Sequence, residues 1–348
     1  MILNKNKLFN PTLDIEIRLI EGKTNGIANL TKSKYPWSKK IYDAMISNGW
    51  IPQEISLGND SNQYKNLNKD EQEAFDKIIS FLVFLDSMVT NALPLLANYI
   101  TAPEVQILLT VQAFQEAVHS QSYAYILESV VSAQKREKIY DLACTDEKMK
   151  KRNEYIANFH QMFLDNPTPH NFLKVVVAQY LLESIYFYSG FAFFYNMARN
   201  NKLTGVAQEI SYINRDENVH MALFSNIFKT LEKENPELFT DKIYEEIYEM
   251  TRTAVEHEIE WANYAYGDSV EGLTVSLVEQ YIKYISNIRL KSIGLSPLYP
   301  ELKKNPLPFI SKMSDFNGVK TDFFENKPIN YSKAGEKLAL DDLDNMDL

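Results

Sequence analysis

The sequence predicts an all-α protein built as a bundle of long helices. Helical periodicity recurs along most of the chain, strand-type alternation is hard to find, and only 11 of the 348 residues are glycine. The hydrophobic content of 45% is typical of a globular chain that buries an extensive core. We expect one helical domain over residues 31–294, an irregular segment over 1–30 and a flexible tail over 295–348.

Local signals place the first helices. A short helix is expected around Trp37–Ser47, before the Asn-Gly pair that follows it. Asn68 and Glu71 have the spacing of a capping pair, in which each side chain bonds to the other residue's backbone N–H. They predict the start of a long apolar helix that meets Pro94 near its end.

Similar signals predict the start of the next helix and the extent of the later ones. Thr101 and Glu104 form a second candidate capping pair, and Pro103 suits the first turn of a helix. After Gly294 the chain contains several prolines, which make another long helix improbable. Further helices are expected within 133–168 and over 171–199, 203–232, 236–266 and 270–291.

Charge and cysteine content exclude several classes of protein. The net charge of −10 disfavours nucleic acid or an anionic membrane as the main partner, because an acidic surface repels both. The single cysteine, Cys144, cannot form an internal disulfide, so a reducing compartment is expected. The first 14 residues lack the apolar core of a signal peptide. We therefore expect a cytoplasmic protein.

Two apolar segments are long enough to span a membrane, residues 78–100 and 172–198. Each carries an acid near its middle, Asp86 in the first and Glu183 in the second. An ionised carboxylate is costly in a bilayer, and the flanks lack basic clusters. Both segments are therefore expected to be buried core helices.

These two acids are spaced regularly from two Glu-x-x-His motifs. Asp86 precedes Glu116 by thirty residues, and Glu183 precedes Glu217 by thirty-four. If the chain turns midway between the members of each pair, antiparallel helices bring each lone acid level with its motif, roughly 20 to 25 Å from the turn. The spacing thus predicts four helices that carry acids at one height.

This arrangement predicts a di-metal centre in a ferritin-like bundle. Residues three apart on a helix share a face, so each motif can offer an oxygen and a nitrogen to one metal. Two divalent cations would neutralise four buried carboxylates, and a mixed oxygen and imidazole set without thiolates suits iron or manganese. The six expected ligands are Asp86, Glu116, His119, Glu183, Glu217 and His220.

A tyrosine continues the first motif along the same face of its helix. Tyr123 lies four residues after His119, whereas the matching position after His220 is Phe224. The phenol could simply pack in the core. It could also lose an electron and a proton to an oxidising metal pair and store a radical. Periodicity leaves both interpretations open.

The order Asp, Glu-x-x-His, Glu, Glu-x-x-His, in the sequences EAVHSQSY (116–123), LLESIYFY (181–188) and RDENVH (215–220), closely resembles the radical-generating small subunit of class I ribonucleotide reductases. The resemblance extends from GWIPQEI (49–55) to the terminal tail. It implies that the six ligands bind two metals and that the centre reacts with an oxygen species and oxidises Tyr123. Related di-metal oxidases share the ligands but not the whole combination.

The resemblance also implies a route for electrons. Trp50 matches the tryptophan of that route, and Asp216 matches the acid that links it to His119. Trp50 could otherwise be a core anchor, and Asp216 could only orient a ligand. The role of Arg215 stays open between Asp216 and another acid.

The C-terminal tail carries the remaining expected features. Tyr331 resembles the tyrosine that relays the radical between subunits, and residues 340–348 resemble the peptide that docks on the large catalytic subunit. The sequence of that peptide, LDDLDNMDL, alternates acidic and apolar residues and could order on a partner's groove. Homodimerisation is expected from the resemblance alone.

The same residues bear on which metals bind and on which other functions compete. Di-iron is the expected metal pair, with di-manganese or a manganese–iron pair as alternatives. A di-manganese centre would imply a flavoprotein that supplies superoxide. The competing functions are a ferritin-like oxidase or hydroxylase of a small apolar substrate, and metal storage. Trp50, Asp216, Tyr331 and the acidic-apolar terminus disfavour an oxidase or hydroxylase. The long tail and the single oxidisable phenol, Tyr123, disfavour metal storage.

Overall fold

The computed structural model describes residues 2–314, so the predictions for Tyr331 and for 340–348 lie outside the described residues. Within them the chain forms long helices joined by short connections, with only isolated bridges of β type. This confirms the all-α fold class. The α-helices are α1 (Pro36–Ser47), α2 (Asp60–Lys65), α3 (Lys69–Ala97), α4 (Pro103–Val130), α5 (Ala133–Thr145), α6 (Glu147–Asp165), α7 (Pro169–Leu181), α8 (Tyr188–Arg199), α9 (Thr204–Glu234), α10 (Asp241–Ala265), α11 (Val275–Ser292) and α12 (Pro308–Ser314).

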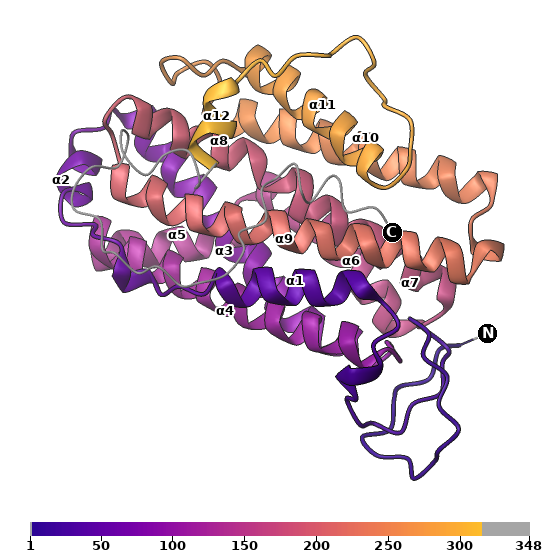
Figure 1. Cartoon of the computed structure of the whole chain (residues 1–348). Helices are drawn as coiled ribbons and strands as arrows, with labels where there is room; N and C mark the ends of the chain where they lie inside the picture. Colours follow the sequence, from indigo (N-terminus) through magenta and orange to yellow (C-terminus); the bar gives the residue numbers. More distant parts are fainter. Residues whose placement is uncertain (1, 315–348) are drawn as a thin grey trace.

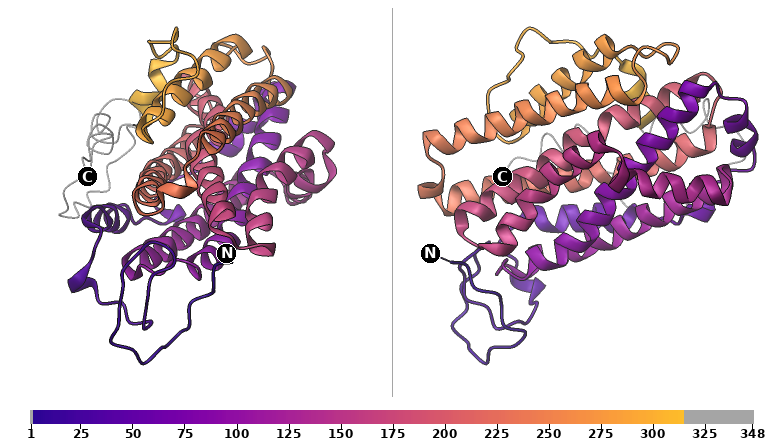
Figure 2. Two further views of the ribbon diagram at one scale, coloured as in Figure 1. Left: turned by 90° about the vertical axis from the view of Figure 1, so that its right-hand side faces the viewer. Right: turned by 180° about the vertical axis from the view of Figure 1, so that it is seen from behind.

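The bundle is organised around two helical hairpins. Helices α3 and α4 pack against each other along their length, and α9 packs against both α7 and α8. The two hairpins meet where α9 contacts α4, with α1 lying across both of these helices (Figure 1). Helices α10 and α11 cover the side of α7 and α8 away from α1, while the N-terminal segment loops below one end of the bundle (Figure 2).

The start of α3 is the expected one. The Asn68 side chain accepts a hydrogen bond from the Glu71 backbone, and the Glu71 carboxylate accepts one from the Asn68 backbone. The helix continues past Pro94 to its end at Ala97. The capping pair at its start therefore forms as predicted.

The start of α4 differs from the prediction. Pro103 does occupy its first turn, but the residue before it, Ala102, is the N-cap and supplies no side-chain bond. The Thr101 hydroxyl instead donates to the Arg18 carbonyl, and the Glu104 carboxylate accepts from the Lys34 backbone at 2.8 Å. The predicted capping pair is wrong because both side chains hold the N-terminal segment against the bundle.

The single helix expected over 171–199 is also wrong. The chain forms α7, then a wider π-helical turn over Leu182–Tyr186 (η3), then α8. A π turn leaves backbone groups without their usual α-helical partners. Here Ser189 N–H donates to the Glu258 carboxylate at 3.0 Å, and Arg289 donates to the Ser184 carbonyl at 3.4 Å. Side chains of α10 and α11 thus support the turn.

Both apolar segments belong to the bundle. Residues 172–198 are buried throughout except at Lys174, as a core helix requires. Among residues 2–314, only α3 has the length and apolarity to cross a bilayer, and half of its most apolar stretch is buried. Such a helix is weak evidence for a membrane span, because core helices share these properties.

Candidate metal centre

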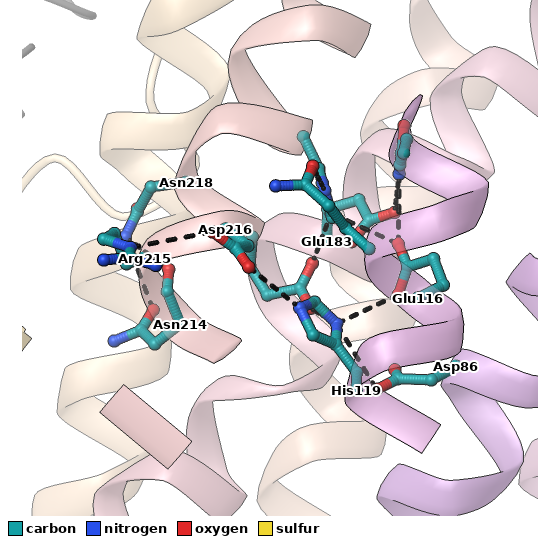
Figure 3. A network of polar contacts seen from close by, with 12 residues as sticks. Asp86, Glu116, His119, Glu183, Asn214, Arg215, Asp216 and Asn218 are labelled. Carbon is teal, nitrogen blue, oxygen red and sulfur yellow. Dashed lines mark hydrogen bonds and ion pairs between the residues drawn. The ribbon is translucent and has the colours of Figure 1, made fainter. Parts of the chain in front are cut away.

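The structure brings all six predicted ligands together at the centre of the bundle. Each ligand side chain is fully buried. Figure 3 shows Asp86, Glu116, His119 and Glu183 converging from neighbouring helices. The six come from α3 (Asp86), α4 (Glu116 and His119), the π turn (Glu183) and α9 (Glu217 and His220).

The ligands form two overlapping groups, each able to hold one cation. One contains Asp86 and His119, the other Glu183 and His220, and both contain Glu116 and Glu217. Within each group the ligand atoms lie within 4.8 Å of one another. Glu116 and Glu217 are therefore shared by both groups, whereas Asp86 and Glu183 each belong to one.

Each histidine turns its Nδ1 atom toward the carboxylates. His119 Nδ1 lies 3.2 Å from Glu116 Oε2 and 3.1 Å from Glu217 Oε1. His220 Nδ1 lies 3.2 Å from Glu116 Oε1 and 3.0 Å from Glu217 Oε2. The two oxygens of each shared glutamate thus face different histidines.

The opposite ring nitrogens are held by two residues in equivalent sequence positions. His119 Nε2 lies 3.3 Å from Asp216 Oδ2, and His220 Nε2 lies 3.0 Å from Gln115 Oε1. Because both partners present an oxygen, each Nε2 carries the proton, which leaves each Nδ1 lone pair for a metal. Asp216 directly precedes Glu217 just as Gln115 directly precedes Glu116, so each motif orients the histidine of the other helix.

The predicted link between Trp50 and the centre is present in the geometry. The Trp50 indole N–H donates to Asp216 Oδ2 at 2.9 Å, and the same oxygen contacts His119 Nε2. Trp50 is buried, with 7% of its surface exposed. Arg215 donates to the Asn48 carbonyl, and its Nε lies 3.6 Å from Asp216 Oδ1. The indole, the carboxylate and the imidazole form a continuous hydrogen-bonded chain.

The unpaired oxygens fit metal binding. Both oxygens of Asp86, Glu183 Oε2 and Glu217 Oε1 are buried without a hydrogen-bond partner among the residues described. Burial and the Glu116 charge raise the pKa of Asp86 well above its usual range. Burial and the charges of Glu217 and Glu116 do the same to the pKa of Glu183. Burial thus disfavours the charged forms of Asp86 and Glu183, and divalent cations bound beside them would favour those charged forms.

Tyr123 shares this buried compartment. Its side chain is fully buried on α4, and its hydroxyl makes no hydrogen bond of normal geometry within residues 2–314. Burial and the nearby Asp86 charge raise the pKa of Tyr123 well above its ordinary value. Phe224, its counterpart on α9, is equally buried. The phenol is therefore neutral and shielded from water.

Sequence reasoning missed three glutamines that contact the ligands. Gln115 could have been found from its position before the first motif, which repeats the position of Asp216. Gln112 and Gln179, which bond to Glu183, carry no comparable signal because glutamine is common on helix surfaces. The three histidines without a predicted site do have polar neighbours, which are Gln179 for His160, Glu246 for His170 and Tyr186 for His257.

Comparison with known proteins identifies relatives of this chain. Residues 27–306 match the family described as "Ribonucleotide reductase, small chain". The ribonucleoside-diphosphate reductase subunit beta of Treponema pallidum is 44% identical over 347 residues, which cover 98% of each chain.

Two solved structures extend the likeness to three dimensions. The ribonucleotide reductase R2 subunit from Clostridium botulinum is 46% identical with a TM-score of 0.88, over 90% of this chain and 99% of that one. The dimanganese(II)-NrdF of Streptococcus sanguinis is 26% identical with a TM-score of 0.73, over 83% of this chain and 99% of that one. The helical fold therefore agrees with that of both solved relatives.

Proposed function

Because the chain belongs to the small-chain family of the ribonucleotide reductases, we propose that it is the subunit that generates and stores the radical of a ribonucleoside-diphosphate reductase. In this function the oxidant passes by long-range electron transfer to a large catalytic subunit, which reduces ribonucleotides to deoxyribonucleotides. The observation that carries the proposal is a buried phenol beside six convergent metal ligands, with an indole hydrogen-bonded through Asp216 to one of them.

Separate residues would bind the metals and store the radical. Asp86, Glu116, His119, Glu183, Glu217 and His220 would hold two metal ions, which supply one-electron oxidising power after reaction with an oxygen species. Tyr123 would lose one electron to that centre and release its hydroxyl proton. Burial supports this role, since water and other reductants cannot reach the oxidised ring.

The route out of the centre begins with contacts inside the bundle. Trp50 is connected to the ligand His119 through the shared Asp216 oxygen, so electron and proton movement can be coupled there. Tyr331, beyond the described residues, would continue the route toward the large subunit. Its proposed role rests on the family resemblance.

The metal pair is proposed to be iron. The ligands supply oxygen and nitrogen only, which both iron and manganese accept. The streptococcal relative is described as a dimanganese protein, which makes di-manganese the first alternative and a manganese–iron pair the second. With di-manganese, a flavoprotein would be needed as the activating partner.

Metal-resolved reconstitution tests the proposal. Apoprotein is loaded with Fe(II) or Mn(II), exposed to oxygen or superoxide, and examined by electron paramagnetic resonance. The parent should give an organic radical that Tyr123→Phe lacks. Tyr125→Phe is the matched control, because Tyr125 lies on the same helix and its hydroxyl donates to the Ile55 carbonyl. An unchanged radical in Tyr123→Phe would reject Tyr123 as its site.

The proposed partners are the large subunit and a second copy of this chain in the cytoplasm, with neither nucleic acid nor membrane. Residues 340–348 would dock on the large subunit. Deleting them should reduce binding to that subunit at least tenfold without changing metal content, as measured by calorimetry and metal analysis. Unchanged affinity would assign docking to another surface.

A further inference from the structure

The two oxygens of Glu183 have different surroundings. Oε1 accepts hydrogen bonds from Gln112 Nε2 at 2.7 Å and from Gln179 Nε2 at close range. Oε2 is buried without a hydrogen-bond partner and lies 3.8 Å from His220 Nδ1. One oxygen is thus saturated by amide donors while the other faces the metal position.

A histidine outside the ligand set fixes the orientation of Gln179. His160 Nε2 lies 2.7 Å from Gln179 Oε1, and the Gln179 amide nitrogen faces Glu183. Since Gln179 Oε1 can only accept, His160 must donate from Nε2. If the Gln179 amide were rotated by 180°, its NH2 group would face the His160 N–H and its oxygen would face the Glu183 carboxylate. Neither hydrogen bond could then form. The chain His160, Gln179, Glu183 therefore runs in one direction from α6 through α7 to the π turn.

Burial makes this chain rigid. Gln179 is fully buried and His160 is 6% exposed, so water cannot readily replace either partner. Burial also lowers the pKa of His160, which favours the neutral imidazole with a single N–H. Gln112 donates hydrogen bonds to two of the predicted ligands, because its amide also reaches Glu116 Oε1 at 3.2 Å. Gln179 donates to Glu183 and to no other predicted ligand.

We propose that Gln179, oriented by His160, is a positioning residue that holds Glu183 in a one-oxygen binding mode and so sets the affinity of the metal on the His220 side. This inference rests on the proposed di-metal function. With Oε1 occupied by amide donors, Glu183 offers only Oε2 to the metal.

A merely structural role makes a different prediction. If Gln179 and His160 only satisfy each other in the core, replacing them should lower stability and weaken both metals alike. If they position Glu183, only one of the two metals should be affected, because Glu183 belongs to one ligand group. Selectivity between the two metal equivalents therefore separates the explanations.

Anaerobic titration of the full-length protein with Mn(II), following free Mn(II) by electron paramagnetic resonance, measures this selectivity. Gln179→Met keeps the volume but removes the donor, and should weaken one equivalent about 10- to 100-fold while changing the other less than about threefold. His160→Phe should weaken the same equivalent. His160→Gln, which restores an N–H donor, should bind like the parent.

A double-mutant cycle tests whether His160 acts through Gln179. In the Gln179→Met background, His160→Phe should cause no further loss of affinity. Asn153→Leu is the matched control, because Asn153 is a buried amide on the same helix α6 that donates to the Ala143 carbonyl, away from the centre. This variant should retain both equivalents.

Other binding results would overturn either the positioning role of Gln179 or the di-metal centre itself. Equal weakening of both equivalents, or parent-like binding by Gln179→Met, overturns the positioning role. If Gln179→Met does not fold, the comparison of His160→Phe with His160→Gln decides in the same way. A parent that binds fewer than two Mn(II) would instead reject the di-metal centre of the proposed function, and this inference with it.

Discussion

At the scale of single residues, Glu209 is an acid buried close to the helix that carries Tyr123. Its carboxylate accepts a hydrogen bond from the Ser122 hydroxyl on α4. Burial raises the pKa of Glu209 from 4.5 to about 8, with a smaller upward contribution from Asp60, and the Ser122 bond opposes the shift only in part. Glu209 therefore stays protonated in the folded protein at neutral pH.

This shift predicts a pH-dependent cost of folding. Between about 4.5 and 8 the unfolded chain has released the Glu209 proton while the folded chain retains it. The free energy of unfolding should therefore fall as pH rises through this window. Glu209→Gln removes that dependence, so the variant should gain roughly 3 kcal/mol relative to the parent between pH 5.5 and pH 8. Urea denaturation of the metal-free protein measures the gain.

Glu234 provides a control, because its pKa is shifted in the direction opposite to that of Glu209. Burial would raise its pKa, but Lys34, the Leu19 backbone and Tyr35 donate to its carboxylate and lower the pKa below the usual 4.5. Both states are ionised above pH 5.5, so Glu234→Gln should lose the same stability at pH 5.5 and at pH 8. A Glu209→Gln gain that does not grow with pH would contradict the assignment.

The metal ligands were predictable from sequence because their geometry is local. Three-residue spacing on a helix and equal distances from a turn place Glu116, His119, Glu217 and His220 without knowledge of packing. The contacts of Gln179 and His160 were not predictable, because they depend on how α6 and α7 pack. Trp50 was placed by family resemblance, since 166 residues separate it from its partner Asp216.

At the scale of helices, the π turn η3 is the feature that apolar periodicity could not reveal. Residues 172–198 are almost all buried, so their apolar sequence pattern is the same whether the helix is regular or contains a wider turn. The turn is supported by a buried ion pair from other helices, between Arg152 on α6 and Glu258 on α10. Arg152 also donates to the Tyr186 carbonyl and stacks 3.8 Å from the Phe81 ring centroid.

Breaking this pair should destabilise the protein more than removing both charges. Glu258→Gln can still accept from Ser189 N–H but leaves the Arg152 guanidinium buried without its counter-charge. We expect a loss of about 3 kcal/mol in the free energy of unfolding. Adding Arg152→Met should recover part of the loss. Urea denaturation of the metal-free variants measures both effects.

An exposed pair supplies the comparison for this prediction. Arg252 and Glu249 form an ion pair at 2.6 Å on the surface of α10, with side chains 46% and 69% exposed. Arg252→Met should change stability by less than about 0.5 kcal/mol. If the double variant at Arg152 and Glu258 is less stable than Glu258→Gln alone, the charge pair is not what supports the turn.

At the scale of the whole molecule, one long face carries no exposed charge. Over residues 78–97 of α3 and 105–127 of α4, the acids are Asp86 and Glu116, and both are buried at the metal centre. The outer surface of these two helices is instead apolar or uncharged, with Phe114 64% exposed and Leu95 45% exposed. Such a surface is typical of a contact between subunits.

This face should be where two copies of the chain associate. In a two-fold symmetric contact each substitution occurs twice, so a buried charge at Phe114 is introduced in both copies. At about 2 kcal/mol per copy, Phe114→Glu should weaken the dimer roughly a thousandfold. Sedimentation velocity would measure the shift from dimer to monomer, and metal content should not change. Tyr140→Glu, at an exposed aromatic on α5, should leave the dimer intact. A Phe114→Glu protein that sediments as a dimer would place the contact on another face.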